Sequence, residues 1–355
     1  MISITVSTSK EYSVLVGGGL QSKSGEMIKE ACGGEIAALV TDDIVDELYG
    51  DAVEKSLSSA GYTTVRFVFP NGERSKNMGT YAMLLCFLAD AKLTRTDVVV
   101  ALGGGVVGDL AGFAAATYMR GIPFAQIPTT VLSMVDSSVG GKTAVDLPVG
   151  KNLVGAFYQP DVVICDIGTL RTLPEDIFND GCAEMVKHGV IQSAELFGML
   201  KEPIRNRMDD RMDDVIARNI IIKRDIVEAD EKDKGIRQVL NFGHTIGHSI
   251  EKHSSFGIAH GKAVAIGMVI ESRAAWRMGI CDESCHLEIV EAVRRFRLPS
   301  ETNITPEALI NEAWFDKKRS GQKITLFLPE RIGKCVMKSF SMDELEEFFR
   351  LGNRN

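Results

Sequence analysis

The stretch Val98-Val-Val-Ala-Leu102-Gly103-Gly-Gly105-Val-Val-Gly108 predicts a buried strand that runs directly into a glycine-rich turn. Residues 109–116 then have a helical pattern. The glycines match G-x-G-x-x-G, in which the backbone approaches a pyrophosphate closely and the helix N-terminus favours its negative charge. By itself the pattern is weak, because any sharp strand-to-helix turn selects glycine. The ribose-binding carboxylate usually found about 20 residues later is missing, so Asp42, which ends an earlier strand, is the better candidate.

Similar short apolar runs occur on both sides of this stretch and end at turn residues. They are 36–40, 65–69, 124–127 and 162–165, with helical patterns at 51–60 and 79–91 between some of them. Strands that alternate with helices indicate a mostly parallel, Rossmann-like sheet with helices on its faces.

The second half of the chain loses this alternation and is mainly helical. Helical patterns cover 209–230, 262–278, 283–296 and 341–350, and the last opens with a capping box, Ser341-x-x-Glu344. The β-prone segments 323–328 and 333–337 predict a hairpin. We therefore expect a nucleotide-binding α/β domain at 1–173 and a mainly α-helical, metal- and substrate-binding domain at 174–355.

Composition narrows the classes of function. Hydrophobic residues make up 45% of the 355 residues and charged residues 25%, as in soluble globular proteins. The formal net charge of -8 argues against general binding to nucleic acids or anionic membranes. The seven cysteines contain no C-x-x-C pair, which indicates reduced thiols in a cytoplasmic protein. Neither a signal peptide nor an apolar run long enough to span a bilayer is evident.

Four of the six histidines lie close together, at His244, His248, His253 and His260. Neutral imidazole is the commonest zinc ligand and also suits proton transfer near neutral pH. By spacing alone, His244 and His248 form the obvious pair of ligands, because residues four apart share one face of a helix. Chance clustering is the alternative, and for His253 we prefer a solvated histidine without a role.

The sequence Gly140-Gly-Lys142-Thr looks like the end of a P-loop. The first glycine of that motif would fall at Asp136, so a P-loop is rejected. Lys142 can still contact a phosphate as a point charge.

Several blocks, in order, closely resemble the 3-dehydroquinate synthase family. They include Gly150-Lys-Asn152 and Asn241-Phe-Gly-His244-Thr-Ile-Gly-His248, and several long blocks in order are far more specific than any single motif. The blocks cover 103–121, 126–130, 135–143, 150–160, 183–189, 237–248, 260–268 and 316–318.

The resemblance implies the fold and the chemistry of the 3-dehydroquinate synthase family. An N-terminal NAD+-binding α/β domain and a helical C-terminal domain would flank an active site in the cleft between them. The family uses NAD+ and one divalent metal, Zn2+ or Co2+, and usually forms a homodimer. It is a carbon–oxygen lyase of the shikimate pathway to chorismate and the aromatic amino acids. It converts the sugar phosphate 3-deoxy-D-arabino-heptulosonate 7-phosphate into 3-dehydroquinate and phosphate.

The resemblance also implies roles for individual residues. The metal ligands would be Glu184, His244 and His260, with His248 in acid–base chemistry and Asp136 and Lys187 at the substrate hydroxyls. Lys223 and Arg237 would bind the carboxylate. Substrate-binding positions near the phosphate would be Lys142, Asn152, Asn241 and Arg120, the last from a partner subunit, and either Lys317 or Lys318 would contact substrate. The NAD+ contacts would be Asp42, Glu73, Lys76, Gly104, Gly105, Val106, Asp109, Thr129, Thr130, Lys142, Lys151, Thr169, Leu170 and Thr172.

Two positions depart from the family pattern. Asp233 stands where Glu is frequent, and Asp146 stands where Asn is common. Neither change removes a group that the reaction requires.

Three alternatives remain. A sister sugar phosphate cyclase, of the 2-deoxy-scyllo-inosose or valiolone synthase type, shares the metal and NAD+, but its substrate lacks the carboxylate that Lys223 and Arg237 would bind. A metal-dependent polyol dehydrogenase would release NADH. A binding protein without catalysis is disfavoured, because all the candidate catalytic positions are filled.

Overall fold

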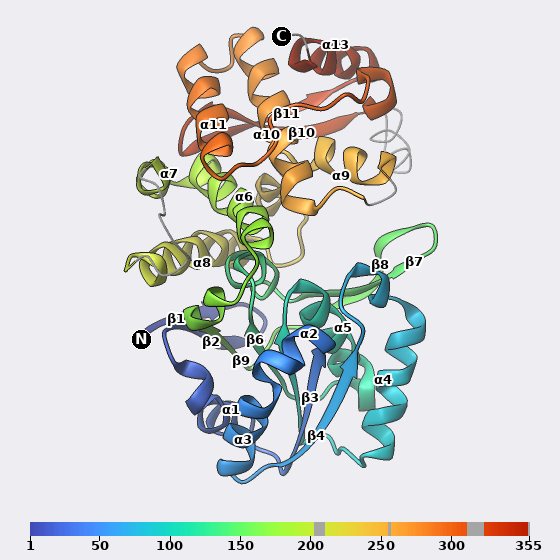
Figure 1. Ribbon diagram of the computed structural model, residues 1–355. Coiled ribbons are helices and arrows are strands. Elements are labelled where there is room, and N and C mark those ends of the chain that lie inside the picture. Colours follow the sequence, from blue (N-terminus) through green and yellow to red (C-terminus); the bar gives the residue numbers. More distant parts are fainter. Residues whose placement is uncertain (202–209, 255–256, 311–322, 354–355) are drawn as a thin grey trace. The chain divides into compact units, whose positions relative to one another are not determined.

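The computed structural model describes residues 1–201, 210–254, 257–310 and 323–353 (Figure 1). The chain divides into two compact units. Unit 1 comprises Met1–Leu173 and Asn206–Lys232, and unit 2 comprises Pro174–Arg205 and Asp233–Asn355. The domains 1–173 and 174–355 stay a prediction. Within the structure, helix α8 (Met212–Ala229) is counted with unit 1 and packs against its strand β1 and π-helix η5.

Unit 1 is built on a seven-stranded sheet. Its order is β1-β2-β9-β6-β5-β3-β4. The strands span Ile2–Ser7 (β1), Glu11–Gly17 (β2), Ile36–Asp42 (β3), Thr63–Phe69 (β4), Val98–Gly103 (β5), Phe124–Pro128 (β6) and Val162–Asp166 (β9). Only the β1–β2 pair is antiparallel within this sheet. The mostly parallel sheet is confirmed, whereas the β1–β2 hairpin was not predicted.

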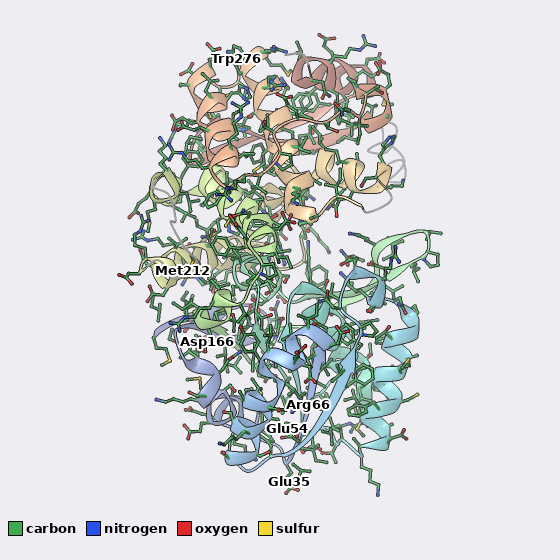
Figure 2. All side chains as sticks on the ribbon, in the orientation of Figure 1. Glu35, Glu54, Arg66, Asp166, Met212 and Trp276 are labelled. Carbon is green, nitrogen blue, oxygen red and sulfur yellow. The ribbon has the colours of Figure 1, made fainter. Side chains whose placement is uncertain are left out.

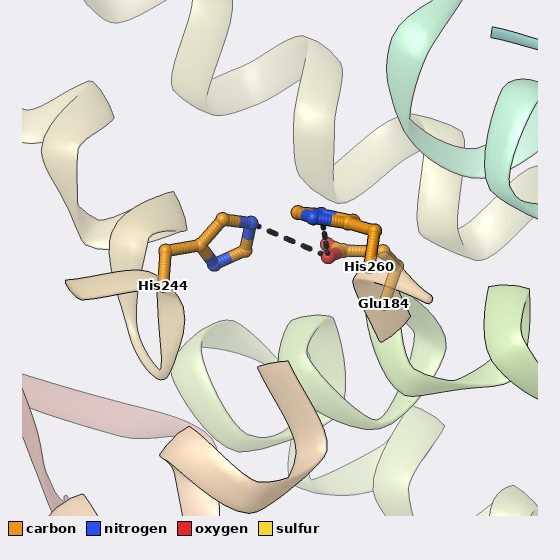
Figure 3. Close-up of side chains that lie close together, drawn as sticks. All are labelled: Glu184, His244 and His260. Atoms are coloured by element: carbon orange, nitrogen blue, oxygen red, sulfur yellow. Dashed lines mark ion pairs between the residues drawn. The ribbon is translucent and has the colours of Figure 1, made fainter. Parts of the chain in front are cut away.

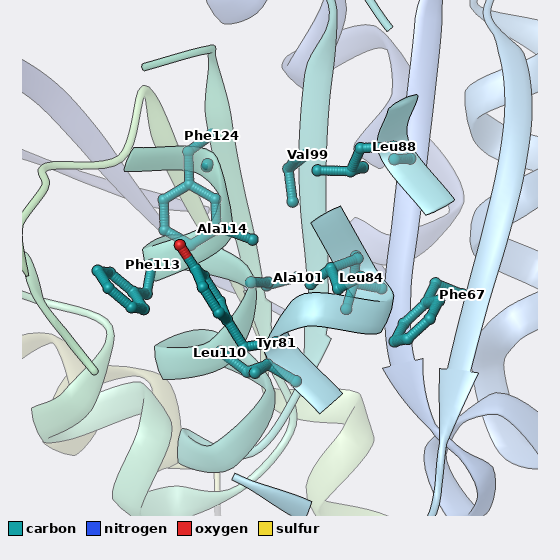
Figure 4. Packing of buried hydrophobic residues seen from close by; sticks show 14 of the residues in the cluster. Phe67, Tyr81, Leu84, Leu88, Val99, Ala101, Leu110, Phe113, Ala114 and Phe124 are labelled. Atoms are coloured by element: carbon teal, nitrogen blue, oxygen red, sulfur yellow. The ribbon is translucent and has the colours of Figure 1, made fainter. Parts of the chain in front are cut away.

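Helices cover both faces of this sheet, which explains why its interior strand β5 has no polar side chain. Val98, Val100 and Leu102 of β5 pack with helices α1 (Ser24–Cys32) and α3 (Asp51–Ser59). Val99 and Ala101 point to the other face, against α4 (Met78–Asp90) and α5 (Gly105–Thr117) (Figure 4). Because successive side chains of a strand point to opposite faces, a strand buried on both sides has no polar face.

The parallel strands have a topological switch point. Counted along the chain, β3, β4, β5, β6 and β9 lie in the spatial order 2-1-3-4-5. This is the flavodoxin-like order, in which ligands bind outside the carboxyl ends of the first and third strands. Here these ends carry Asp42, after β3, and the turn Gly103–Gly105, after β5.

Shorter elements complete unit 1. They are η1 (Leu20–Lys23), α2 (Asp43–Val45), η2 (Asp46–Gly50), η3 (Glu73–Ser75), η4 (Tyr118–Arg120), η5 (Ser133–Ser137), η6 (Ile167–Arg171) and an antiparallel hairpin of β7 (Lys142–Leu147) and β8 (Gly150–Phe157). The sequence analysis missed this second hairpin.

An ion network joins edge strand β4 to the helices after β3. Arg66 of β4 contacts Asp46 at 3.0 Å, Asp51 at 2.9 Å and also Glu54 (Figure 2). It ties the start of α3 to the sheet edge.

Unit 2 is mainly helical and centres on α10 (His260–Arg277), which packs against four other helices in the described part of the unit. Other elements of that part include α6 (Glu175–Gln192), α7 (Ala194–Lys201), η7 (Ile236–Asn241), α9 (His244–His253), α11 (Glu283–Arg295), α13 (Met342–Asn353) and the hairpin β10 (Ile324–Arg331) with β11 (Lys334–Phe340). The predicted hairpin is confirmed. The capping box is also confirmed, since the backbone N–H of Ser341 donates to Glu344 at 2.7 Å.

None of the helices in the described part of the chain combines the length and the apolar character needed to cross a membrane.

Two carboxylates tie the end of α8 and the residue pair after it to the rest of unit 1, Glu228 in the last turn of α8 and Glu231 just beyond it. Glu228 accepts a hydrogen bond from the backbone N–H of Ser7 at 2.6 Å. Glu231 accepts from the backbone N–H and hydroxyl of Ser9, at 3.0 and 2.6 Å, and from Nε2 of Gln159 at 3.0 Å. Partial burial by itself would raise the pKa of Glu231, but these hydrogen bonds lower it to about 2.

We expect Glu231→Gln to destabilise the protein in a pH-dependent way. The folded state prefers the ionised carboxylate, so its contribution is complete above the ordinary pKa of 4.5 and is lost as pH falls toward 2. The variant should lose about 1–3 kcal/mol at pH 7. Thermal melting of both proteins from pH 7 to pH 3 measures this. A gap in melting temperature that does not narrow below pH 4.5 would contradict it.

Candidate metal centre and dinucleotide site

Three helices of unit 2 bring one carboxylate and two imidazoles together. Glu184 lies in the middle of α6, and His244 and His260 are the first residues of α9 and α10. One ligand atom from each lies within 4.8 Å of the others (Figure 3). The Nε2 atoms of His244 and His260 lie 3.4 and 3.6 Å from Oε1 of Glu184.

These separations suit a metal ion better than direct hydrogen bonds. N–H···O hydrogen bonds usually span 2.7–3.2 Å, so 3.4 and 3.6 Å are long. Two ligand atoms at about 2.1 Å from one ion, at a tetrahedral angle, lie about 3.4 Å apart. The donor set of two imidazoles and a carboxylate is also typical of catalytic zinc sites, which keep a fourth position open. The residues present therefore fit a divalent metal.

Both imidazoles are held so that Nε2 faces Glu184. The Nδ1 atom of His244 lies 3.2 Å from the carbonyl oxygen of Phe242, and Nδ1 of His260 lies 3.3 Å from Oε2 of Glu251. A carbonyl oxygen only accepts, so Nδ1 of His244 carries the proton and Nε2 has the lone pair. This is the arrangement of metal-binding histidines in general.

Close approach of backbones lets the three helices meet. A Cβ at Gly261 of α10 would overlap the carbonyl oxygen of Asp180 in α6. A Cβ at Gly267 would overlap the carbonyl oxygen of Gly243, the residue that caps α9. The missing side chains thus allow α10 to touch both α6 and the turn before His244.

The charges in this group are strongly coupled. Burial would raise the pKa of Glu184, but Lys187, His244 and His260 hold it well below its usual value. Burial, followed by the charge of Lys187, lowers the pKa of His244 well below its usual value. Burial would likewise lower the pKa of His260, but the nearby carboxylates of Glu184 and Glu251 raise it to about 10.

His248 does not join the Glu184 group. Its ring lies 5.5 Å from that of His244, measured between centroids, and its side chain is exposed. Instead His248 forms a second, overlapping group with Glu251 and His260. The pair His244 and His248 that spacing suggested is therefore not the set that converges on Glu184.

Other sequence-predicted residues of unit 2 lie on α6 and η7. Lys187 is 1% exposed and forms an ion pair with Oε2 of Glu184 one helical turn away. Arg237 of η7 is buried, and Asn241, which ends η7, is exposed. Lys317 and Lys318 lie outside the described residues.

Glu251 was missed by the sequence analysis. It lies seven residues after His244, two helical turns along the same face of α9, and this spacing is a signal that could have revealed it.

In unit 1, the predicted dinucleotide residues Asp42 and Gly104 to Val106 lie at the carboxyl ends of β3 and β5. The Asp42 side chain accepts from the backbone N–H groups of Ile44 and Val45 and so caps α2. Gly104 caps α5, which begins at Gly105 rather than at residue 109 as predicted. The helix thus presents its N-terminal N–H groups at Gly105 and Val106, where a pyrophosphate is favoured.

A buried lysine links several of these positions. Lys76 is 4% exposed, lies 2.6 Å from Asp109 and 3.9 Å from Glu73, and Glu73 lies 3.5 Å from Lys151. Burial would lower the pKa of Lys76, but the charges of Asp109 and Glu73 outweigh it and raise the pKa. Residues 73 and 76 therefore form one ion network with residues 109 and 151, which lie far from them in the sequence.

The hydroxyl residues of the predicted site lie in two turns. The backbone N–H of Thr129 donates to Gly103 at 3.0 Å, and the Thr130 and Ser133 hydroxyls lie 2.8 Å apart. Thr169 and Leu170 lie in η6, and Tyr49 contacts both the Thr169 carbonyl, at 3.1 Å, and the Thr172 hydroxyl.

The substrate positions predicted in unit 1 are dispersed. Lys223 of α8 lies 2.7 Å from Oδ1 of Asp136 in η5. Lys142 begins β7 and is exposed, and Arg120, also exposed, ends η4. Asn152 has a positive φ of 55° in β8.

The structure gives a local explanation for one of the two departures from the family pattern, Asp233, and none for Asp146. Oδ1 of Asp146 accepts a hydrogen bond from the backbone N–H of Asn152 at 2.8 Å, and the backbone N–H of Asp146 donates to the carbonyl oxygen of Lys76 at 2.8 Å. Asn would supply the same acceptor. Asp233 has a φ of 57°, a left-handed conformation that short side chains such as Asp tolerate.

Comparison with known proteins shows the family of the chain. Residues 66–180 match the N-terminal domain of 3-dehydroquinate synthase, and residues 181–319 match its C-terminal domain. The chain belongs to the 3-dehydroquinate synthase family. The 3-dehydroquinate synthase of Enterococcus faecalis is 42% identical over 351 residues, which are 98% of this chain and 98% of that protein.

Solved structures of sugar phosphate cyclases share the fold of this family member. The 2-epi-5-epi-valiolone synthase of Streptomyces hygroscopicus subsp. jinggangensis, with NAD+ and Zn2+ bound, is 25% identical with a TM-score of 0.89, covering 98% of each chain. A 2-deoxy-scyllo-inosose synthase, complexed with carbaglucose-6-phosphate, NAD+ and Co2+, is 23% identical with a TM-score of 0.89, covering 98% of this chain and 99% of that chain.

We expect Gly267→Ala to disturb both stability and the metal centre. The added methyl would push α10 away from Gly243 and so displace His244, with a cost of about 1–3 kcal/mol in the free energy of unfolding. Melting temperature and bound zinc per chain measure the two effects. Gly198→Ala in α7 is the matched control, because its Cβ would meet nothing within 4 Å. Equal melting temperature and zinc content in Gly267→Ala and the control would contradict the packing argument.

Proposed function

We propose that this chain is a 3-dehydroquinate synthase, which converts 3-deoxy-D-arabino-heptulosonate 7-phosphate into 3-dehydroquinate and phosphate. The observation that carries the proposal is the convergence of Glu184, His244 and His260 at metal-ligand spacing. It occurs in a chain that is 42% identical to a 3-dehydroquinate synthase over nearly its full length.

The proposed reaction consists of transient oxidation of a ring alcohol, elimination of phosphate, reduction of the ketone, ring opening and an intramolecular aldol closure. When bound, NAD+ accepts and returns a hydride, and the metal acts as a Lewis acid at the substrate hydroxyls. Glu184, His244 and His260 would hold the metal. The oxidation and the reduction cancel, so the reaction as a whole is redox-neutral.

The other proposed roles belong to residues that carry protons or charge. His248 has an exposed imidazole, which suits proton transfer with a substrate. Asp136 and Lys187 would orient the substrate hydroxyls. Lys223 and Arg237 would bind the carboxylate, and Lys317 or Lys318 would add a further contact.

For the phosphate we propose Lys142, Asn152 and Asn241, with Arg120 from a partner subunit. An acidic protein with a net charge of -8 requires such local cations to bind a dianion.

For NAD+ we propose the switch point of the unit 1 sheet. The N-terminal N–H groups of α5, at Gly105 and Val106, would bind the pyrophosphate after the turn at Gly104. Asp42 would bind a ribose. The remaining proposed contacts are Glu73, Lys76, Asp109, Thr129, Thr130, Lys142, Lys151, Thr169, Leu170 and Thr172.

We also propose a homodimer in the cytoplasm. Apolar side chains are exposed on the β7–β8 hairpin, where Val149 is 80%, Leu153 57% and Phe157 40% exposed, and a second copy of the chain would cover them. Light scattering of the purified protein measures the mass. All seven cysteines are free thiols, as suits a reducing compartment.

The central test is release of phosphate from the heptulosonate phosphate. We expect release that requires both NAD+ and a divalent metal, that stops on addition of a chelator and that returns with Zn2+ or Co2+. NADH absorbance should not accumulate at steady state. Net NADH production would instead favour a polyol dehydrogenase, and absence of phosphate release with both cofactors present would exclude the proposal.

The carboxylate of the substrate separates this function from that of the sister cyclases. We expect Arg237→Ala to lower kcat/KM by a factor that corresponds to a loss of about 2–5 kcal/mol of transition-state stabilisation. The reason is that a bound carboxylate would lose its buried ionic partner. Steady-state kinetics measure this. Metal content and melting temperature show whether the variant is folded. A folded variant with nearly unchanged kcat/KM would argue for a sister activity.

A further inference from the structure

We propose that Glu251 is a positioning residue for the metal centre. Its carboxylate accepts the Nδ1–H of His260, holds the imidazole with Nε2 toward Glu184 and so strengthens cation binding. The inference rests on the proposed metal site and deepens it.

The position of Glu251 allows its carboxylate to fix the orientation of the His260 imidazole. It lies on α9, is 3% exposed, and its Oε2 is 3.3 Å from Nδ1 of His260. The contact joins two helices, because His260 is the first residue of α10. A buried carboxylate costs free energy unless it has such partners.

His260 needs this support more than His244 does. The His260 side chain is 28% exposed, whereas that of His244 is 11% exposed and its Nδ1 is held by the backbone carbonyl of Phe242. Packing therefore restrains the His260 ring less. If the ring turned over, a carbon atom would replace Nε2 next to Glu184.

The carboxylate contributes in two ways that can be separated. It accepts a hydrogen bond, which fixes the tautomer, and it carries a negative charge, which makes Nε2 a stronger donor to a cation. Glutamine retains an acceptor oxygen but has no charge. Alanine has neither.

A competing interpretation makes Glu251 a ligand. His248, Glu251 and His260 form a group within 4.8 Å, and this group overlaps the Glu184 group through His260. In that case the chain would bind two ions, one of them through Nδ1 of His260. The pairing of one imidazole nitrogen with each carboxylate favours a single ion beside Glu184, with Glu251 as the hydrogen-bond acceptor.

The test uses the full chain, stripped of metal with a chelator and titrated with Zn2+ and with Co2+. The variants are Glu251→Gln and Glu251→Ala, and the matched control is Glu346→Gln on the exposed surface of α13, which removes the same charge elsewhere in the unit. Dissociation constants come from competition with a chromophoric chelator. The visible absorption of bound Co2+ reports the ligand geometry, and the melting temperature of the metal-free proteins reports folding.

We expect Glu251→Ala to weaken binding about 10- to 100-fold, as removal of such supporting partners typically does, and to change the Co2+ spectrum. Glu251→Gln should lie between Glu251→Ala and the wild type, and Glu346→Gln should match the wild type. An unchanged dissociation constant and spectrum in Glu251→Ala would overturn the inference. A stoichiometry of two ions that falls to one in Glu251→Ala would overturn it as well, in favour of a ligand role.

Phosphate release by the wild type is measured in parallel. If the wild type binds no metal and releases no phosphate, the proposed function fails. If it does both and Glu251→Ala binds metal equally well, only the role of Glu251 fails.

Discussion

The contact of α10 with two neighbouring backbones is the constraint on which the metal centre depends. At Gly261 and Gly267 there is no room for a side chain, so α10 lies directly against α6 and against the turn that begins α9. Each of these elements carries one member of the Glu184 group. Helices separated by ordinary side chains lie 8–10 Å apart. The side chains of Glu184, His244 and His260 can meet at one ion only if the helices that carry them approach one another closely.

The metal centre contains several ionisable groups in a buried position, and each of them lies next to a group of matching charge or hydrogen-bonding character. Glu184 is fully buried but faces Lys187 and two imidazoles. Each imidazole in turn has its second nitrogen next to an acceptor. Buried polar groups of this kind are stable only when their hydrogen bonds and charges are matched. Unit 1 follows the same rule at Lys76, whose burial is balanced by Asp109 and Glu73.

Several features could be predicted from the sequence because they depend on neighbouring residues. The apolar runs of β3, β4, β5, β6 and β9 identify strands buried on both faces, and the capping box marks the start of α13. The β1–β2 and β7–β8 hairpins were missed, and α5 was predicted to begin too late. Glycine has a low helix propensity, so the pattern at Gly105 and Gly108 did not predict the first turn of α5. Packing against the sheet stabilises this turn.

The sequence by itself determined the buried parallel strands, several of the helices, the family, and the side chains available for chemistry. Only the tertiary structure decided which of these side chains meet. Spacing along α9 suggested that His244 pairs with His248, but His244 turns to Glu184 while Glu251 turns to His260. Periodicity reports the faces of one helix, whereas the convergence of ligands depends on contacts between helices that no local pattern encodes.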